Sequence, residues 1–121
     1  VIRAVSRAPS DSARGRTWFD RGVRGLQRWI DRLWARERYY YLGEWHFHPQ
    51  GAPLPSATDI RQMEQVAASV NYRCPEPILV IIGGDPPRHW ELRVFIFPHS
   101  APYQELKPDR LVHRMAQAKN G

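Results

Sequence analysis

Apolar residues recur at helical spacing in two stretches of the chain. Between about residues 20 and 36 they are four, three, four and three positions apart, which gives one helix face formed by Phe19, Val23, Leu26, Ile30 and Leu33. Asp20 is suited to cap this helix, and arginines occupy much of its remaining surface. A second helix is expected from its N-cap, Ser56, to about Val70, with an apolar face of Ile60, Met63, Val66 or Ala67, and Val70.

Other stretches have the patterns of strands. Residues 39–47 are rich in aromatic side chains, and residues 78–82 form a continuous apolar run that suits a strand buried on both faces. Residues 90–97 alternate as a strand does, and the turn-forming residues 83–87 predict a hairpin that makes the last two strands antiparallel. A short strand is also expected at residues 1–6, and a short helix at about residues 106–116.

The order strand, helix, strand, helix, strand, strand predicts a single α/β domain around a mixed β-sheet flanked by helices. The 121 residues suffice for one domain and not for two. No apolar run approaches the ~18 residues that cross a bilayer, which excludes an integral membrane protein. The lone cysteine, Cys74, excludes an internal disulfide framework and a Cys-rich zinc finger. We expect it to be an inert thiol in a cytoplasmic protein.

Positive charge is concentrated in the first third of the chain. The net charge is +6, and residues 1–38, with ten arginines and four acidic residues, account for the whole excess. Such a segment can bind nucleic acid or another acidic partner. The alternative, which we favour, is a solvated helix face whose arginine stems cover apolar surface.

Candidate metal ligands are found between residues 46 and 59. His46 and His48 are two apart on a predicted strand, so their side chains share one face, about 6.6 Å apart along it. Pro49 ends the strand, and the next loop leads to Ser56 and to Asp59 in the first turn of its helix. Two imidazoles and a carboxylate leave a fourth position open for water, as in a catalytic zinc site. The alternative is that both histidines merely face solvent at a strand end.

The pattern His-x-His-Pro, six residues, Ser, two residues, Asp resembles the metal-binding signature of the JAMM family, also called MPN-plus or JAB domains. Residues 41–46 and 59–63 are similar to a bacterial JAB subgroup found in operons with ubiquitin-activating- and conjugating-type enzymes, some of them antiphage systems. The resemblance covers about residues 1–100, which we expect to form the domain, with residues 101–121 as a C-terminal tail. It implies a JAMM/MPN-like, cytidine-deaminase-like fold and a zinc-dependent isopeptidase or peptidase that cleaves at the C-terminus of ubiquitin-like proteins.

The resemblance also implies the role of each residue. His46, His48 and Asp59 would bind one Zn²⁺, and Ser56 would hydrogen-bond the developing oxyanion, which is often worth a few kcal/mol of the barrier. Zinc would lower the pKa of its water toward ~7 and polarise the scissile carbonyl. The substrate tail would lie in an extended conformation along a sheet edge near the metal.

The sequence departs from the family in its general base. The family uses a glutamate on a strand well upstream of the histidines, whereas no glutamate precedes Glu37 here. We therefore expect that strand, and the base, to lie before Val1. Glu44 shares the strand face of His46 and His48, but its Cα should lie about 10 Å along the strand from their midpoint. That separation favours a role in supporting a ligand histidine over a role as the base.

The remaining candidate residues carry less weight than the ligand set, and two other function classes are compatible with the sequence. Phe47 replaces a small hydroxyl residue of the family and should point to the opposite strand face, and His89, His99 and His113 are expected at the surface. A non-catalytic MPN-type scaffold and a nucleic-acid module that uses the arginine-rich helix both stay open. Zinc content would separate the nucleic-acid module from the other two, and hydrolysis would separate the enzyme from the scaffold.

Overall fold

A computed structural model of the chain describes residues 1–14, 19–20 and 22–108. At its centre is a four-stranded sheet in the order β3-β4-β5-β6, formed by β3 Gly43–Pro49, β4 Ile78–Asp85, β5 His89–Ile96 and β6 Gln104–Leu106. Strands β3 and β4 are parallel and are connected through helix α2 (Ala57–Ala68), whereas β5 is antiparallel to both of its neighbours. The mixed sheet confirms the predicted α/β class and the predicted hairpin.

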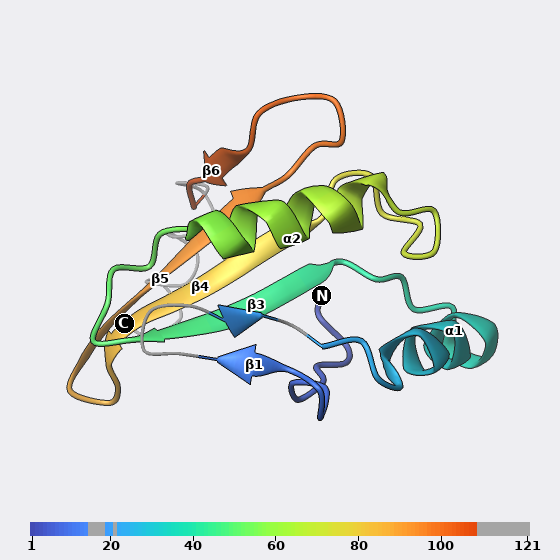
Figure 1. The fold of residues 1–121 in the computed structure, drawn as a ribbon, viewed down its shortest axis with the longest axis horizontal. Coiled ribbons are helices and arrows are strands. Elements are labelled where there is room, and N and C mark those ends of the chain that lie inside the picture. Colours follow the sequence, from blue (N-terminus) through green and yellow to red (C-terminus); the bar gives the residue numbers. More distant parts are fainter. Residues whose placement is uncertain (15–18, 21, 109–121) are drawn as a thin grey trace, which may run out of the picture.

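Helix α2 lies across one face of the sheet (Figure 1). Met63 of α2 contacts Leu79 and Ile81 of β4 and Phe95 of β5, and these side chains form the buried core together with Phe97. The side of β5 that bears Trp90 and Leu92 remains about half exposed. The core therefore lies between α2 and one sheet face, the face to which His46 and His48 also belong.

Helix α1 spans Leu26–Glu37 and begins six residues later than Asp20, the predicted cap. Asp20 instead belongs to strand β2 (Phe19–Asp20), which is antiparallel to β1 (Ala13–Arg14). Gly25 has a φ of 75° and occupies the N-cap position, so the left-handed backbone there prevents an earlier start. The predicted helix start was therefore wrong.

The apolar face of α1 does not pack directly on the sheet as its spacing suggests. Leu26, Trp29 and Leu33 instead line a cavity of about 1090 Å³ that separates the helix from β3. Three arginines of α1 at four-residue spacing are exposed, as predicted: Arg28, Arg32 and Arg36. In the described part of the chain, neither helix combines the length and apolar character needed to cross a bilayer.

Both ends of the chain differ from the sequence-based expectation. The strand predicted at residues 1–6 is absent, because this segment pairs with no strand among the described residues. It lies beside β3, where Trp45 Nε1 donates to the Ser6 carbonyl over 3.4 Å. Strand β6 lies beyond residue 100, so part of the expected tail belongs to the sheet. Leu106, where a helix over residues 106–116 was expected to begin, is instead the last residue of β6. The residues of that expected helix after 108 lie outside the described residues.

The burial of α2 can be tested by a matched pair of valine substitutions. Val66 is 2% exposed in the core, whereas Val70, just after the helix, is 85% exposed. Val66→Ala should lower the free energy of unfolding by about 2 kcal/mol, because it removes two buried methyl groups and leaves a cavity. Val70→Ala should change it by less than about 0.5 kcal/mol. Urea denaturation followed by circular dichroism measures both; equal effects would contradict the packing of α2 on the sheet.

Candidate metal centre

The alternation of β3 separates its side chains into two sets. His46 and His48 are 2% and 6% exposed on the side that faces α2, whereas Trp45 and Phe47, on the other side, are 48% and 43% exposed. Phe47 thus points away from the histidines, as predicted, and its ring does not obstruct them. The strand presents both imidazoles to the N-terminal turn of α2.

A capping box fixes the carboxylate that meets these histidines. Ser56 Oγ accepts the Asp59 backbone N–H over 3.1 Å, and Asp59 Oδ2 accepts the Ser56 N–H over 2.7 Å. This reciprocal pair satisfies two donors that the first helical turn leaves open. It also holds the fully buried Asp59 side chain in one orientation, with its other oxygen directed at β3.

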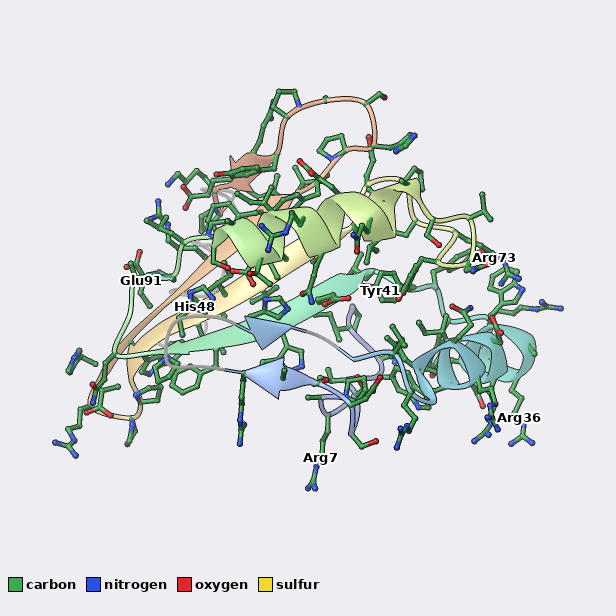
Figure 2. All side chains as sticks on the ribbon, in the orientation of Figure 1. Arg7, Arg36, Tyr41, His48, Arg73 and Glu91 are labelled. Atoms are coloured by element: carbon green, nitrogen blue, oxygen red, sulfur yellow. The ribbon has the colours of Figure 1, made fainter. Side chains whose placement is uncertain are left out.

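The three candidate ligands converge in the structure. Asp59 Oδ1 lies 2.6 Å from His46 Nδ1, and Asp59 Oδ2 lies 3.3 Å from His48 Nε2. One donor atom from each residue lies within 4.8 Å of the others, and all three residues are buried. Figure 2 shows His48 directed from β3 toward the first turn of α2. Residues 13 positions apart in the sequence thus form one compact donor set of two imidazoles and a carboxylate.

The donor set fits a metal ion, because the second ring nitrogen of His48 is directed at a carboxylate. His48 Nδ1 lies 3.2 Å from the Ala52 carbonyl oxygen, which can only accept, so Nδ1 carries the hydrogen. Its Nε2 is buried and has no hydrogen-bond partner among the described residues, yet it lies 3.3 Å from Asp59 Oδ2. Two lone pairs at this distance repel, so either a proton on Nε2 or a metal ion has to lie between the two atoms. Nitrogen and carboxylate ligands of this kind suit Zn²⁺.

His46 is strongly coupled to the acidic groups on either side of it. Burial lowers the pKa of His46, but hydrogen bonds to Asp59 and Glu44 outweigh this effect and raise the pKa to about 9. Burial raises the pKa of Asp59, but hydrogen bonds from His46 and Ser56 lower it by more, so the pKa of Asp59 is below its usual value. Without metal the site therefore holds an imidazolium between carboxylates. Because a ligand nitrogen must be unprotonated, metal binding has to displace that proton.

Glu44 lies closer to the donor set than strand spacing suggests. Its Oε2 is 3.4 Å from His46 Nε2, and its Oε1 accepts the Tyr41 hydroxyl over 2.9 Å. Spacing along the strand fixes only the separation of the Cα atoms, and the Glu44 side chain extends far enough to bridge that separation. Tyr41 belongs to the stretch 41–46 that resembles the bacterial JAB subgroup and to the aromatic run before the histidines, but the sequence alone gave it no role of its own.

Gly83 is a second position that the sequence analysis interpreted differently. It was assigned to a turn, but it lies within β4, directly opposite His48. A Cβ on Gly83 would come within 2.4 Å of the Gly51 carbonyl oxygen and 2.7 Å of Pro53 N. Only a glycine lets residues 51–53 cross the strand this closely, and that crossing brings the Ala52 carbonyl to His48.

The remaining candidates lie apart from the donor set. His89 and His99 are exposed, and His113 lies outside the described residues. Burial raises the pKa of the Cys74 thiol, which disfavours the reactive thiolate. Within the described residues, His46, His48 and Asp59 are the one group of metal-ligating side chains close enough together to bind an ion.

Most of the described chain is similar to known proteins. Residues 2–93 match the sequence model of the prokaryotic homologues of the JAB domain. A "CD-NTase/cGAS isopeptidase" of Enterobacter hormaechei subsp. hoffmannii is 46% identical over 98 residues, which cover 81% of this chain and 53% of that protein. An Escherichia coli protein of the same name is 31% identical over 69% of this chain and 52% of its own length. A "Probable metalloprotease y4qB" of Sinorhizobium fredii is 32% identical over 46% of this chain and 42% of its own length. The chain thus spans about half the length of the curated relatives it matches.

Metal content tests the donor set directly. Purified protein should contain about one equivalent of zinc, because three donors converge and leave one position open. His48→Ala removes one ligand and should lose the metal, whereas His89→Ala, at an exposed position, should retain it. Inductively coupled plasma analysis after gel filtration measures the content. Undiminished zinc in the His46→Ala/His48→Ala double variant would show that the metal lies elsewhere.

Proposed function

Because the chain belongs to the family of prokaryotic homologues of the JAB domain, we propose that it is the metal-binding part of a zinc-dependent isopeptidase. Its ligands would be His46, His48 and Asp59. The observation that carries the proposal is the convergence of two buried imidazoles on the buried Asp59 carboxylate, with one donor atom of each residue within 4.8 Å of the others. A non-catalytic scaffold would have no need to retain this arrangement.

The chain's own residues would perform two tasks in hydrolysis. A zinc ion held by the donor set would polarise the scissile carbonyl and make water a nucleophile near neutral pH. The capping box and the Ala52 carbonyl hold the ligands in place before any substrate arrives. This preorganisation removes the cost of arranging the ligands during the reaction.

Ser56 would stabilise the oxyanion while it caps α2. Its Oγ accepts the Asp59 N–H with a lone pair, so the hydroxyl hydrogen stays available to donate. The side chain is only partly buried, and it stands one helical turn before the ligand carboxylate. A carbonyl polarised at the donor set would therefore have a hydrogen-bond donor beside it.

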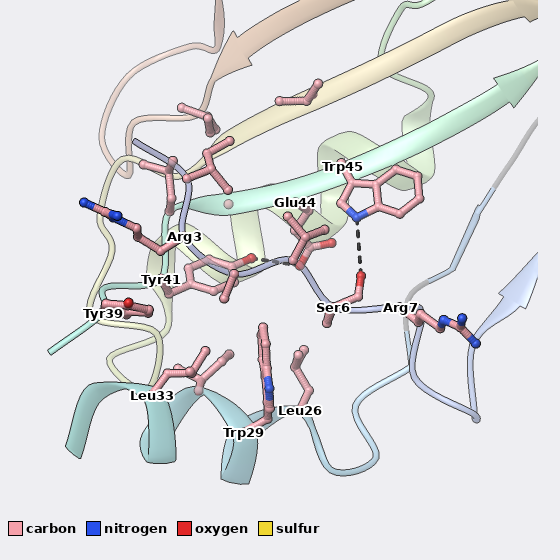
Figure 3. Close-up of a pocket in the computed structure, with 18 of the residues that line it drawn as sticks. Arg3, Ser6, Arg7, Leu26, Trp29, Leu33, Tyr39, Tyr41, Glu44 and Trp45 are labelled. Carbon is pink, nitrogen blue, oxygen red and sulfur yellow. Dashed lines mark hydrogen bonds between the residues drawn. The ribbon is translucent and has the colours of Figure 1, made fainter. Parts of the chain in front are cut away.

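Among the described residues, the edge of β3 away from β4 pairs with no strand, and it offers a place for an extended substrate tail. Leu42 and Gln50 pair with β4 through their backbones, so in a parallel ladder the alternate peptide groups of Trp45 and Phe47 face away from β4. The cavity lies at this edge and reaches Glu44 and His46 (Figure 3). A peptide could add to the edge as a further strand, with Trp45 as part of the cavity wall.

We propose a ubiquitin-like protein as the substrate, joined through its C-terminus to a lysine of another protein. Three of the relatives are named CD-NTase/cGAS isopeptidase, so a CD-NTase is the favoured modified protein. Enzymes that attach and remove such a tag would act together in a bacterial antiphage system, in the cytoplasm.

Hydrolysis of a defined conjugate tests the proposal. A ubiquitin-like protein joined by an isopeptide bond to a CD-NTase lysine should be cleaved by the wild-type chain, and a chelator should abolish cleavage until zinc is restored. His48→Ala should be inactive, and Val70→Ala should match the wild type. Gel electrophoresis and mass spectrometry of the released C-terminus provide the readout. Zinc binding without any cleavage, both by this chain and by a version extended at its N-terminus, would favour the scaffold instead.

The two roles of Ser56 can be separated by comparing alanine with glycine. Ser56→Ala should lower the free energy of unfolding by about 1 kcal/mol, whereas Ser56→Gly should lower it by only a few tenths, because glycine is tolerated at an N-cap. Both variants should slow cleavage by about 10²–10³-fold, the usual effect of losing an oxyanion donor. Zinc content should stay at the wild-type level. If cleavage instead falls only in proportion to stability, Ser56 acts as a cap alone.

A further inference from the structure

The imidazole of His46 lies between two carboxylates that belong to different elements. Its Nδ1 is 2.6 Å from Asp59 Oδ1 on α2, and its Nε2 is 3.4 Å from Glu44 Oε2 on β3. All three side chains are buried: those of His46 and Asp59 are at most 1% exposed, and that of Glu44 is 6% exposed. Each ring nitrogen of His46 therefore has its own acidic neighbour, and only Asp59 belongs to the proposed donor set.

Glu44 is in turn held by a tyrosine that lies outside the signature. The Tyr41 hydroxyl donates to Glu44 Oε1 over 2.9 Å, and both side chains line the cavity at the edge of β3 (Figure 3). The Tyr41 ring contacts Tyr72, in the loop after α2, with 4.7 Å between ring centroids. The contacts thus run without a gap from the loop after α2, through Tyr41 and Glu44, to His46.

We propose that Glu44 and Tyr41 are positioning residues that orient the His46 ring for metal binding. Glu44 accepts the Nε2 hydrogen of His46, which leaves Nδ1 unprotonated and directed toward Asp59 once the metal displaces the proton. Tyr41 fixes the Glu44 carboxylate for this task. Ligand histidines usually donate their second N–H to such an acceptor, which sets the tautomer and ring orientation. This inference rests on the proposed metal site.

The placement of Glu44 favours this role over that of a general base. One carboxylate oxygen accepts from Tyr41, and the other lies at the His46 nitrogen that is farther from Asp59. The imidazole ring thus stands between Glu44 and the donor set. A base, in contrast, needs hydrogen-bond reach to the attacking water, directly or through one water molecule.

Zinc affinity of the full 121-residue chain, measured by competition with a chromophoric chelator, tests the proposal. Glu44→Ala should weaken zinc binding about 10–100-fold, the usual cost of losing such a partner. Glu44→Gln keeps a carbonyl acceptor for His46 and should recover most of that loss. Tyr41→Phe should weaken binding to a smaller extent, whereas Tyr40→Phe, at a tyrosine that is 75% exposed, should not. The visible spectrum of the cobalt-substituted protein should change in Glu44→Ala and Tyr41→Phe and stay unchanged in Tyr40→Phe.

The outcomes separate this inference from the proposed function. If the wild-type chain binds no zinc, the metal site itself is wrong. If the wild type binds zinc and both Glu44→Ala and Tyr41→Phe bind it equally well, the positioning role is wrong and the metal site stands. If Glu44→Ala keeps full zinc affinity but lowers kcat about 10²–10⁴-fold, Glu44 is the base and the positioning role is overturned. Thermal unfolding monitored by circular dichroism identifies any variant that loses zinc only because it has not folded.

Discussion

The contact between Asp59 on α2 and His46 on β3 joins the helix to the sheet and organises the site. Asp59 is fully buried, and a buried carboxylate is costly unless it is paired and hydrogen-bonded. Here one oxygen faces the imidazole of His46 and the other accepts the Ser56 N–H. The same carboxylate therefore closes the first turn of α2, ties that helix to β3 and presents an oxygen to both histidines. Helix, sheet and site depend on the same few atoms.

The charges of this cluster favour a divalent cation. Two buried carboxylates, Glu44 and Asp59, surround one imidazolium when no metal is bound, which leaves an excess of negative charge in a water-poor site. A divalent ion that replaces the His46 proton would balance both carboxylates. The bound cation would then be the largest local charge, and its repulsion of the imidazolium would lower the pKa of His46. The cluster is thus better balanced with the metal than with the proton.

The sequence predicted the convergence of His46, His48 and Asp59 better than it predicted the surroundings, because this convergence depends on short-range geometry. Strand alternation alone places His46 and His48 on one face, and a Ser-x-x-Asp sequence specifies its own capping box. In contrast, the start of α1 depended on the left-handed backbone at Gly25, and the apolar residues of segment 1–6 fitted a strand for which the described residues supply no partner. The alternation of residues 90–97 could not tell which side is buried, since that depends on where α2 lies. The distance of Glu44 from the ligands was predicted from its Cα position alone, although the length of its side chain determines what it contacts.

The alternation of β3 also assigns different work to neighbouring residues. Positions 44, 46 and 48 face α2 and carry the acidic and imidazole groups, while Trp45 and Phe47 face the other way and are about half exposed. The peptide groups of these two aromatic residues lie at the free edge of the sheet, where a peptide can pair. A substrate held at this edge would lie within a few residues of the ligands without displacing either of them. Under the proposed function, one strand would combine the buried ligands with an edge for the substrate, and Tyr41, just before the strand, would link the two.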